Sequence, residues 1–231
     1  MDEQILITIS GPIGVGKSDF AELLSEEFGY DYHPEEVSSP EDIEVLNQYY
    51  WAVGELIKET NPQKTIELRK TVLNTQKYFI RKRAKSLEEI TREGRNAVLE
   101  RDPDDDIHIF SQDGLNHDRL TELEFNEIVK YAHTKTQNLI KPSLRVFLVA
   151  YPFELRKRIA KRGRESEKSL LYPHNPYLND QFKLHMEFYG LYDKPKLICN
   201  NSSFKKPEET MQFLFPWKKQ SLESYLLLLD N

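Results

Sequence analysis

Two hydrophobic patterns alternate along this chain: short apolar runs and longer segments with helical spacing. The apolar runs are rich in β-branched residues and predict buried strands of a parallel sheet. They cover residues 5–10, 30–33, 96–100, 144–150 and 197–199. The segments in between predict amphipathic helices. They cover residues 17–28, 40–90, 118–139, 153–163 and 179–192. Pro62 is expected to divide the second of these segments into two helices.

The order of these elements predicts an α/β fold. Strands that alternate with helices form a parallel sheet covered by helices on both faces. The acidic run at 102–106 follows the third strand and is expected to form an exposed turn. No stretch has the composition of a linker, so we predict one domain over residues 1–231.

Composition narrows the class of protein. The 231 residues are 39% hydrophobic and 30% charged, which is enough to bury a core. A net charge of −6 argues against broad binding to nucleic acid or to an anionic membrane. The start lacks a basic region typical of a signal peptide, and no apolar run approaches the roughly 18 residues of a membrane span. The single cysteine, Cys199, excludes an internal disulfide, so we expect a cytoplasmic protein. The sequence leaves the oligomeric state open, and a homodimer is one of the possibilities.

A glycine-rich segment after the first strand matches the phosphate-loop pattern G-x-x-x-x-G-K-[ST]. It consists of Gly11, Pro12, Ile13, Gly14, Val15, Gly16, Lys17 and Ser18. Glycines let backbone N–H groups surround phosphate oxygens at a helix N-terminus. Lys17 can reach the β- and γ-phosphates, and the Ser18 hydroxyl can bind Mg²⁺. The alternative is a turn without a ligand, but the strand before and the helix after favour nucleoside triphosphate binding.

Six cations lie within residues 156–164. A basic helix end can be a solvated face that complements the helix dipole. The alternative is a lid, over about residues 157–175, whose guanidinium groups close over a triphosphate. Arg158 and Arg162 share a helix face, and Arg164 follows the turn at Gly163. Together with the phosphate loop, this segment favours a small-molecule kinase over a nucleotide switch.

Five sequence blocks, in order, resemble the deoxynucleoside kinase family. They are residues 11–18, 35–37, 76–83, 98–101 and 158–167. The last block is the most specific, whereas the first is shared with many phosphate-loop proteins. The resemblance implies a three-layer P-loop kinase fold with a five-stranded parallel sheet and a basic lid. It also implies ATP as the phosphate donor and Mg²⁺ as the metal.

The resemblance also implies catalytic roles for individual residues. Glu35 would be the general base for the nucleoside 5′-hydroxyl, with Glu36 as the alternative one position away. Glu100 would join Ser18 in the Mg²⁺ shell, and Arg101 would contact the 5′-oxygen and the transferred phosphate. In the lid, Arg158 and Arg162 would act on the phosphoryl group, Arg162 and Arg164 would bind the triphosphate, and Glu167 would bind the sugar 3′-hydroxyl.

The base site implied by the resemblance lies on the long helix and after the third strand. Gln76 and Arg83 are almost two helical turns apart and can point into one pocket. Asp106 would pair with Arg83 and bind the base edge, and Phe110 would stack on the ring. Read without the resemblance, Gln76 and Asp106 are equally well ordinary surface residues. No tyrosine before Gln76 matches the ribose-binding tyrosine of the family.

These features predict ATP-dependent phosphorylation of the 5′-hydroxyl of a deoxynucleoside. Ile107 replaces an arginine of some animal members and predicts a roomier pocket, which slightly favours purine deoxynucleosides. A nucleoside monophosphate kinase and a non-catalytic nucleotide-binding subunit are the alternatives.

Overall fold

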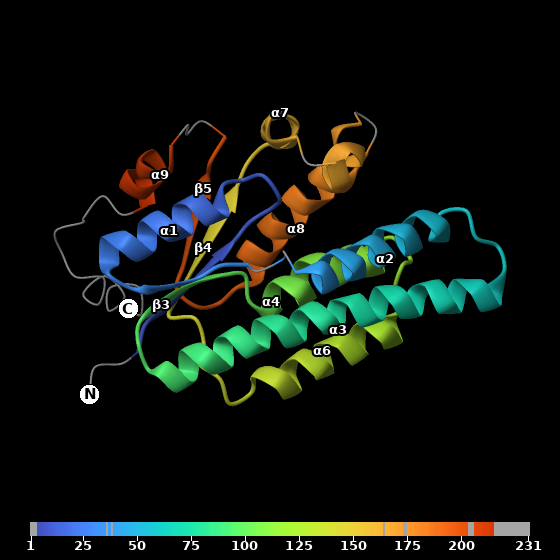
Figure 1. Ribbon diagram of the computed structural model, residues 1–231, viewed down its shortest axis with the longest axis horizontal. Coiled ribbons are helices and arrows are strands. Elements are labelled where there is room, and N and C mark those ends of the chain that lie inside the picture. The colour runs from blue at the N-terminus through green and yellow to red at the C-terminus, as the bar shows by residue number, and fades with distance from the viewer. Residues whose placement is uncertain are drawn as a thin grey trace. The chain divides into compact units, whose positions relative to one another are not determined.

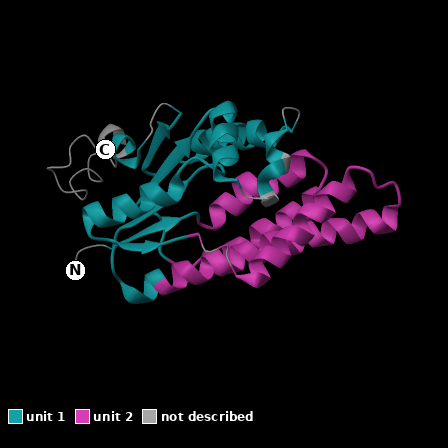
Figure 2. Ribbon diagram, turned by 45° about the horizontal axis from the view of Figure 1, so that its top comes forward, with its two compact units in different colours: residues 1–34, 90–101, 140–231 teal, residues 35–89, 102–139 magenta. Residues whose placement is uncertain are grey.

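The chain folds into two compact units in a computed structural model that describes residues 4–35, 37, 39–163, 165–172, 175–202 and 206–214. Unit 1 comprises residues 1–34, 90–101 and 140–231, and unit 2 comprises residues 35–89 and 102–139 (Figure 2). The prediction of a single domain stays a prediction.

Unit 1 is a five-stranded parallel sheet flanked by helices, as predicted (Figure 1). The strands run in the order β2-β3-β1-β4-β5. They are β1 (Leu6–Ser10), β2 (Asp31–His33), β3 (Ala97–Glu100), β4 (Leu144–Val149) and β5 (Lys196–Asn200). Its helical segments are α1 (Lys17–Phe28), α7 (Pro152–Arg162), the 3₁₀ segment η2 (Glu165–Leu171), α8 (Tyr177–Leu191) and α9 (Pro207–Leu214).

The central strands of unit 1 are buried on both faces, which explains their continuous apolar sequence. Successive residues of β4 face opposite sides of the sheet. Val146 belongs to the hydrophobic cluster that contains Phe20 and Leu24 of α1. Phe147 packs edge-to-face on Phe188 of α8, with ring centroids 5.3 Å apart. The sheet is therefore the middle of three layers.

Unit 2 is helical. It contains α2 (Pro40–Leu56), most of α3 (Pro62–Glu93), α4 (Pro103–Asp105), the π-helical segment η1 (Asp106–Ser111), α5 (Gln112–Asn116) and α6 (Glu122–Thr136). As predicted, α3 begins at Pro62. Its core is a separate hydrophobic cluster from α2, α3, α6 and the turn before α6: Ala52, Leu68, Val72, Leu73, Ile80, Leu120, Ile128 and Ala132.

The predicted acidic turn at 102–106 is wrong, because this segment is helical and mostly buried. Asp102 caps α4: its side chain accepts from the Asp104 N–H, while Asp105 reaches back to the Asp102 N–H. Pro103 occupies the first helical position, which it favours. An aspartate followed by a proline and further acidic residues is therefore a pattern typical of a helix N-terminus.

Other helix boundaries differ slightly from the predictions. The helix expected over 118–139 is shorter, because Thr121 forms a capping box that starts α6 at Glu122. The predicted helices over 153–163 and 179–192 start at Pro152 and Tyr177. In the part of the chain that the structure describes, no helix is both long enough and apolar enough to cross a membrane.

Candidate active site

The phosphate loop joins β1 to α1 in unit 1, and its glycines have distinct structural reasons. Gly14 and Gly16 have φ angles of 79° and 93°, which glycine adopts without strain. A Cβ on Gly11 would lie 2.5 Å from the main-chain oxygen of Leu148. The loop therefore requires glycine at all three positions, whereas the sequence pattern specifies glycine only at positions 11 and 16.

The loop borders a cavity of about 900 Å³ in unit 1. Its lining comes from the loop, the start of α1, α7 and the segment after β5: Gly14, Val15, Gly16, Lys17, Ser18, Asp19, Phe20, Glu154, Arg158, Lys161, Arg162, Asn201, Ser202, Lys206, Pro207 and Thr210. The buried Lys17 donates from Nζ to the Pro12 carbonyl at 3.3 Å. Five basic side chains and a helix N-terminus make this cavity suitable for an anion.

Glu100 links the loop to the neighbouring strands of unit 1. The Ser18 hydroxyl donates to Glu100 Oε2 at 3.0 Å, and the Tyr32 hydroxyl donates to Glu100 Oε1. Burial raises the pKa of Tyr32, and Glu100 raises it further, so the phenol stays a donor. The structure thus brings together the two predicted Mg²⁺ ligands, Ser18 and Glu100. Sequence reasoning missed Tyr32, because its short strand carries little signal beyond its aromatic residues.

Arg101 follows β3 in a left-handed conformation, with φ at 59°. Such a backbone is uncommon for a residue other than glycine and clusters at functional sites. The Arg101 N–H donates to the Ile9 carbonyl at 3.1 Å, and Nη2 donates to the Gly11 carbonyl at 3.1 Å. Arg101 is thereby fixed against the first residue of the phosphate loop.

His185 of α8 is a buried polar side chain in unit 1 that sequence reasoning missed. Its Nδ1 lies 2.6 Å from the main-chain oxygen of Gln181. Burial lowers the pKa of His185 to about 3, and Arg101 and Lys17 act in the same direction. The ring is therefore neutral at physiological pH, and Nδ1 carries its proton, because a carbonyl oxygen can only accept.

The lid residues have partners within unit 1. Arg162 forms a bidentate ion pair with Glu167, with Nη2 at 2.7 and 2.8 Å from the two carboxylate oxygens. Arg158 donates to the main-chain oxygens of Val15, at 3.1 Å, and Asn201, at 2.5 Å. The roles predicted for these arginines on the phosphates stay predictions. Arg164 lies outside the described residues.

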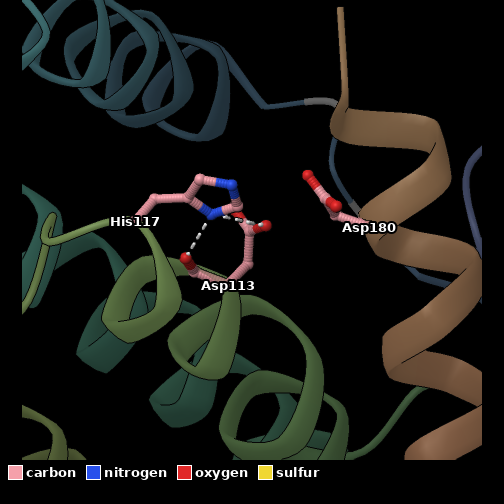
Figure 3. Close-up of side chains that lie close together, drawn as sticks. All are labelled: Asp113, His117 and Asp180. Carbon is pink, nitrogen blue, oxygen red and sulfur yellow. Dashed lines mark hydrogen bonds and ion pairs between the residues drawn. The ribbon is translucent and has the colours of Figure 1, made fainter.

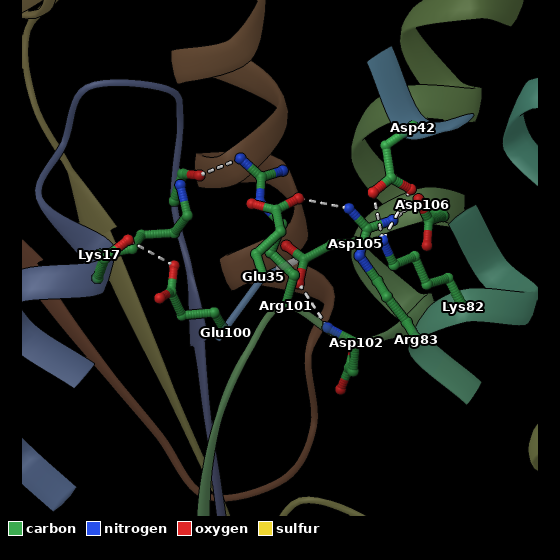
Figure 4. A network of polar contacts seen from close by, with 12 residues as sticks. Lys17, Glu35, Asp42, Lys82, Arg83, Glu100, Arg101, Asp102, Asp105 and Asp106 are labelled. Atoms are coloured by element: carbon green, nitrogen blue, oxygen red, sulfur yellow. Dashed lines mark hydrogen bonds and ion pairs between the residues drawn. The ribbon is translucent and has the colours of Figure 1, made fainter. Parts of the chain in front are cut away.

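In unit 2, one guanidinium group binds two of the predicted site carboxylates (Figure 4). Arg83 donates from Nη1 to Asp106, which confirms the predicted pair, and from Nη2 to Glu35 Oε1 at 2.6 Å. Burial raises the pKa of Asp106, and the charge and hydrogen bond of Arg83 oppose this rise. Burial disfavours the charge of Arg83, but Asp106 and Glu35 outweigh it and raise the pKa of the guanidinium. Glu36, the alternative base, lies outside the described residues.

The other predicted base-site residues lie on two helical segments of unit 2. Gln76 is a buried residue of α3, two turns before Arg83. Phe110 is partly buried in η1, which begins at Asp106. A short π-helical segment is rare and often marks a functional site.

A second polar cluster of unit 2 lies at the end of α5 (Figure 3). The His117 Nδ1 lies 2.9 Å from the main-chain oxygen of Asp113 and 3.4 Å from its Oδ1. Arg119 donates to Asp113 Oδ2 at 2.7 Å. These contacts tie the end of α5 to the turn before α6.

The sequence and the fold are similar to those of known nucleoside kinases. A family model described as deoxynucleoside kinase matches residues 7–214. A deoxyguanosine kinase of Lactobacillus johnsonii is 30% identical over 220 residues, which cover 90% of this chain and 88% of the relative. A deoxyguanosine kinase of Bacillus subtilis is 29% identical over 174 residues, covering 74% of this chain and 72% of the relative.

Solved structures agree on the fold. A deoxyadenosine kinase from M. mycoides with bound dATP superposes with a TM-score of 0.66 at 23% identity, covering 91% of this chain and 98% of that one. The same kinase with bound dCTP gives a TM-score of 0.64 at 23% identity, covering 98% and 97%. The family match extends over most of the described residues. It includes the phosphate loop, Glu100 and Arg101 at the end of β3, and the predicted lid. This chain is therefore a kinase that belongs to the deoxynucleoside kinase family.

Proposed function

We propose that this protein transfers the γ-phosphoryl group of ATP to the 5′-hydroxyl of a deoxynucleoside, preferably deoxyguanosine or deoxyadenosine. Unit 1 supplies the donor site, because its basic cavity includes the phosphate loop. Unit 2 supplies the groups that recognise the base and accept the proton of the 5′-hydroxyl. The absence of membrane-spanning helices among the described residues and the single cysteine fit a cytoplasmic enzyme.

The observation that carries this proposal is the shared guanidinium of Arg83. It binds Asp106, the expected reader of the base edge, and Glu35, the expected proton acceptor. A kinase that acts on a nucleoside needs one group for the base and one for the 5′-hydroxyl. Arg83 fixes both carboxylates with charge-assisted hydrogen bonds, so recognition and activation belong to one network.

At the donor site, backbone N–H groups of the loop and Lys17 would hold the phosphates. Ser18 and Glu100 offer oxygen ligands that suit Mg²⁺, and their 3.0 Å contact supports a joint role. When bound, Mg²⁺ would neutralise charge on the phosphate oxygens. Tyr32 would keep the Glu100 carboxylate oriented through its hydrogen bond.

Transfer needs a proton acceptor and cations at the reacting oxygens. Glu35 would take the proton of the 5′-hydroxyl as that oxygen attacks phosphorus. Arg101 would stabilise charge on the 5′-oxygen and the transferred phosphate, and its fixed position beside Gly11 limits its movement. Arg162 would add positive charge from the lid.

The preference for purines rests on Gln76, Ile107 and the relatives. A glutamine amide can bind the N6/N7 edge of adenine with two hydrogen bonds. Ile107 stands where some family members have an arginine, so Arg83 has no second arginine beside it at this position. The similar proteins are named deoxyguanosine and deoxyadenosine kinases, which fits a pocket for purine deoxynucleosides.

A coupled assay of ADP release with four deoxynucleosides and their monophosphates tests this proposal, with Lys17→Ala as the inactive control. We expect deoxyguanosine or deoxyadenosine to have a kcat/KM at least about tenfold above thymidine and deoxycytidine. A lead of deoxycytidine or thymidine would refute the purine preference. Activity on monophosphates alone would show the monophosphate kinase alternative to be right, and ADP binding without turnover would show a non-catalytic subunit.

A further inference from the structure

The carbonyl oxygen of Val15, within the phosphate loop, accepts two hydrogen bonds from outside the loop. Asn201 donates from Nδ2 at 2.7 Å, and Arg158 donates from Nη1 at 3.1 Å. Neither donor is a neighbour in sequence: Arg158 lies on α7, and Asn201 directly follows β5. Two separate elements of unit 1 therefore hold one peptide group of the loop.

The Asn201 side chain is itself fixed in orientation. Its Oδ1 accepts from the hydroxyl of Thr210, on α9, at 2.8 Å. Its main-chain N–H donates to Val149 at 2.7 Å, and its carbonyl accepts from Arg158. Asn201 and Thr210 are both buried. Because the Val15 carbonyl can only accept, Nδ2 faces Val15 and Oδ1 faces Thr210, whose hydroxyl donates to it and holds the amide in this orientation.

The orientation of this peptide matters because the C=O and N–H of a trans peptide point in opposite directions. A Val15 carbonyl held towards Asn201 turns the Gly16 N–H to the opposite side. Gly16 has a φ of 93°, and glycine tolerates either sign of φ, so little in the residue itself prevents the peptide from turning over. The Gly16 N–H is one of the donors that a phosphate loop offers to phosphate oxygens.

We propose that Asn201 and Thr210 are positioning residues for the phosphate donor. Thr210 orients Asn201, Asn201 holds the Val15 carbonyl together with Arg158, and the Gly16 N–H is thereby aimed at the phosphate. Neither residue needs to touch the reacting atoms. This inference rests on the proposed function, since it deepens the account of the donor site.

Thr210 allows a sharp test, because valine has nearly the same shape without the hydroxyl. We expect Thr210→Val to weaken Mg·ADP binding, measured by calorimetry, by about three- to tenfold, the effect of losing one hydrogen bond. Thr210→Ser keeps the donor and should bind Mg·ADP like the wild type. Glu208→Gln, an exposed change on the same helix, is the control. The KM for ATP should rise with the Kd, while the KM for the deoxynucleoside stays within about twofold.

A double-mutant cycle separates positioning from general destabilisation. If Thr210 acts through Asn201, Thr210→Val should have almost no further effect on Mg·ADP affinity in an Asn201→Ala background. Equal weakening in both backgrounds, or wild-type affinity of Thr210→Val, would overturn the proposal. ADP binding needs no deoxynucleoside, so this test stands even where the assay of deoxynucleoside phosphorylation fails.

Discussion

Arg162 and Glu167 face each other in the predicted lid and form an ion pair through both carboxylate oxygens. The two residues are expected to bind different ligands, the phosphates and the sugar 3′-hydroxyl. In this state each neutralises the other, and the pair holds the end of α7 against η2. If the two residues bind these ligands as predicted, ligand binding would replace or share these hydrogen bonds.

Substitutions in this ion pair should separate effects on phosphoryl transfer from effects on deoxynucleoside binding. We expect Arg162→Ala to lower kcat by about 10²–10³-fold, because the guanidinium acts on charge that develops in the transition state. Glu167→Gln should raise the deoxynucleoside KM about tenfold and leave kcat within about threefold. Steady-state kinetics with both substrates varied would show the split. The opposite pattern, with a raised KM in Arg162→Ala and a lost kcat in Glu167→Gln, would contradict these roles.

Glu35→Gln should retain deoxynucleoside binding and lose turnover. Glutamine keeps an oxygen for the Nη2 of Arg83 but cannot take a proton, so we expect kcat to fall by about 10²–10⁴-fold. Calorimetry with the deoxynucleoside and kcat measured on the same preparation check this prediction. Glu41→Gln, an exposed change on α2, is the matched control. Normal turnover in Glu35→Gln together with an inactive Glu36→Gln would show that Glu36, and not Glu35, is the general base.

The Ser18 hydroxyl should govern the requirement for Mg²⁺. We expect Ser18→Ala to raise the Mg²⁺ concentration for half-maximal activity about tenfold, since it removes one ligand beside Glu100. Ser18→Thr retains the hydroxyl and should behave like the wild type. Titration of activity with Mg²⁺ after treatment with a chelator gives the comparison. An unchanged Mg²⁺ requirement in Ser18→Ala would remove this residue from the metal site.

His185 should make the stability of the protein depend on pH. Its pKa is about 3 in the folded chain against an ordinary value of 6.5, so the unfolded chain binds a proton first as the pH falls. The stability associated with the neutral ring is complete above about pH 6.5 and is lost as the pH falls towards 3. The loss is about 1.4 kcal/mol per pH unit within that range.

Urea unfolding of the wild type and His185→Gln at pH 7, 6 and 5 measures this effect. Glutamine does not titrate, so the stability difference between the two proteins should shrink as the pH falls. A difference that stays constant from pH 7 to 5 would show that the folded and unfolded chains protonate His185 alike.

The sheet and the phosphate loop could be predicted from the sequence because their signals are local. A fully buried strand such as β4 is a continuous apolar run, and the loop requires glycine for steric reasons that leave a readable pattern. Asn201 could not be predicted, because an asparagine after a short strand looks like any turn. Its contacts are with Arg158 of α7, 43 positions earlier, and Thr210 of α9, nine positions later, and no local sequence pattern marks either contact.

The helical start at Asp102 could have been predicted. Asp102, Pro103 and Asp105 occupy the capping, first and third positions that these residue types favour. The cluster of acids also resembles an exposed turn, and only burial distinguishes the two. The ion pair of Arg83 with Asp106 could be predicted from the family resemblance. The contact of Arg83 with Glu35 joins residues 48 positions apart, and no local sequence pattern indicates it.

The path of the chain has a consequence for how such an enzyme changes during evolution. The chain leaves unit 1 after β2 and again after β3, and the two excursions build their own hydrophobic cluster from residues of unit 2. Mutations that reshape this cluster leave the apolar contacts of the sheet intact. Base specificity can thus change during evolution through mutations in the two segments of unit 2. The phosphate loop and the sheet of unit 1 can stay unchanged.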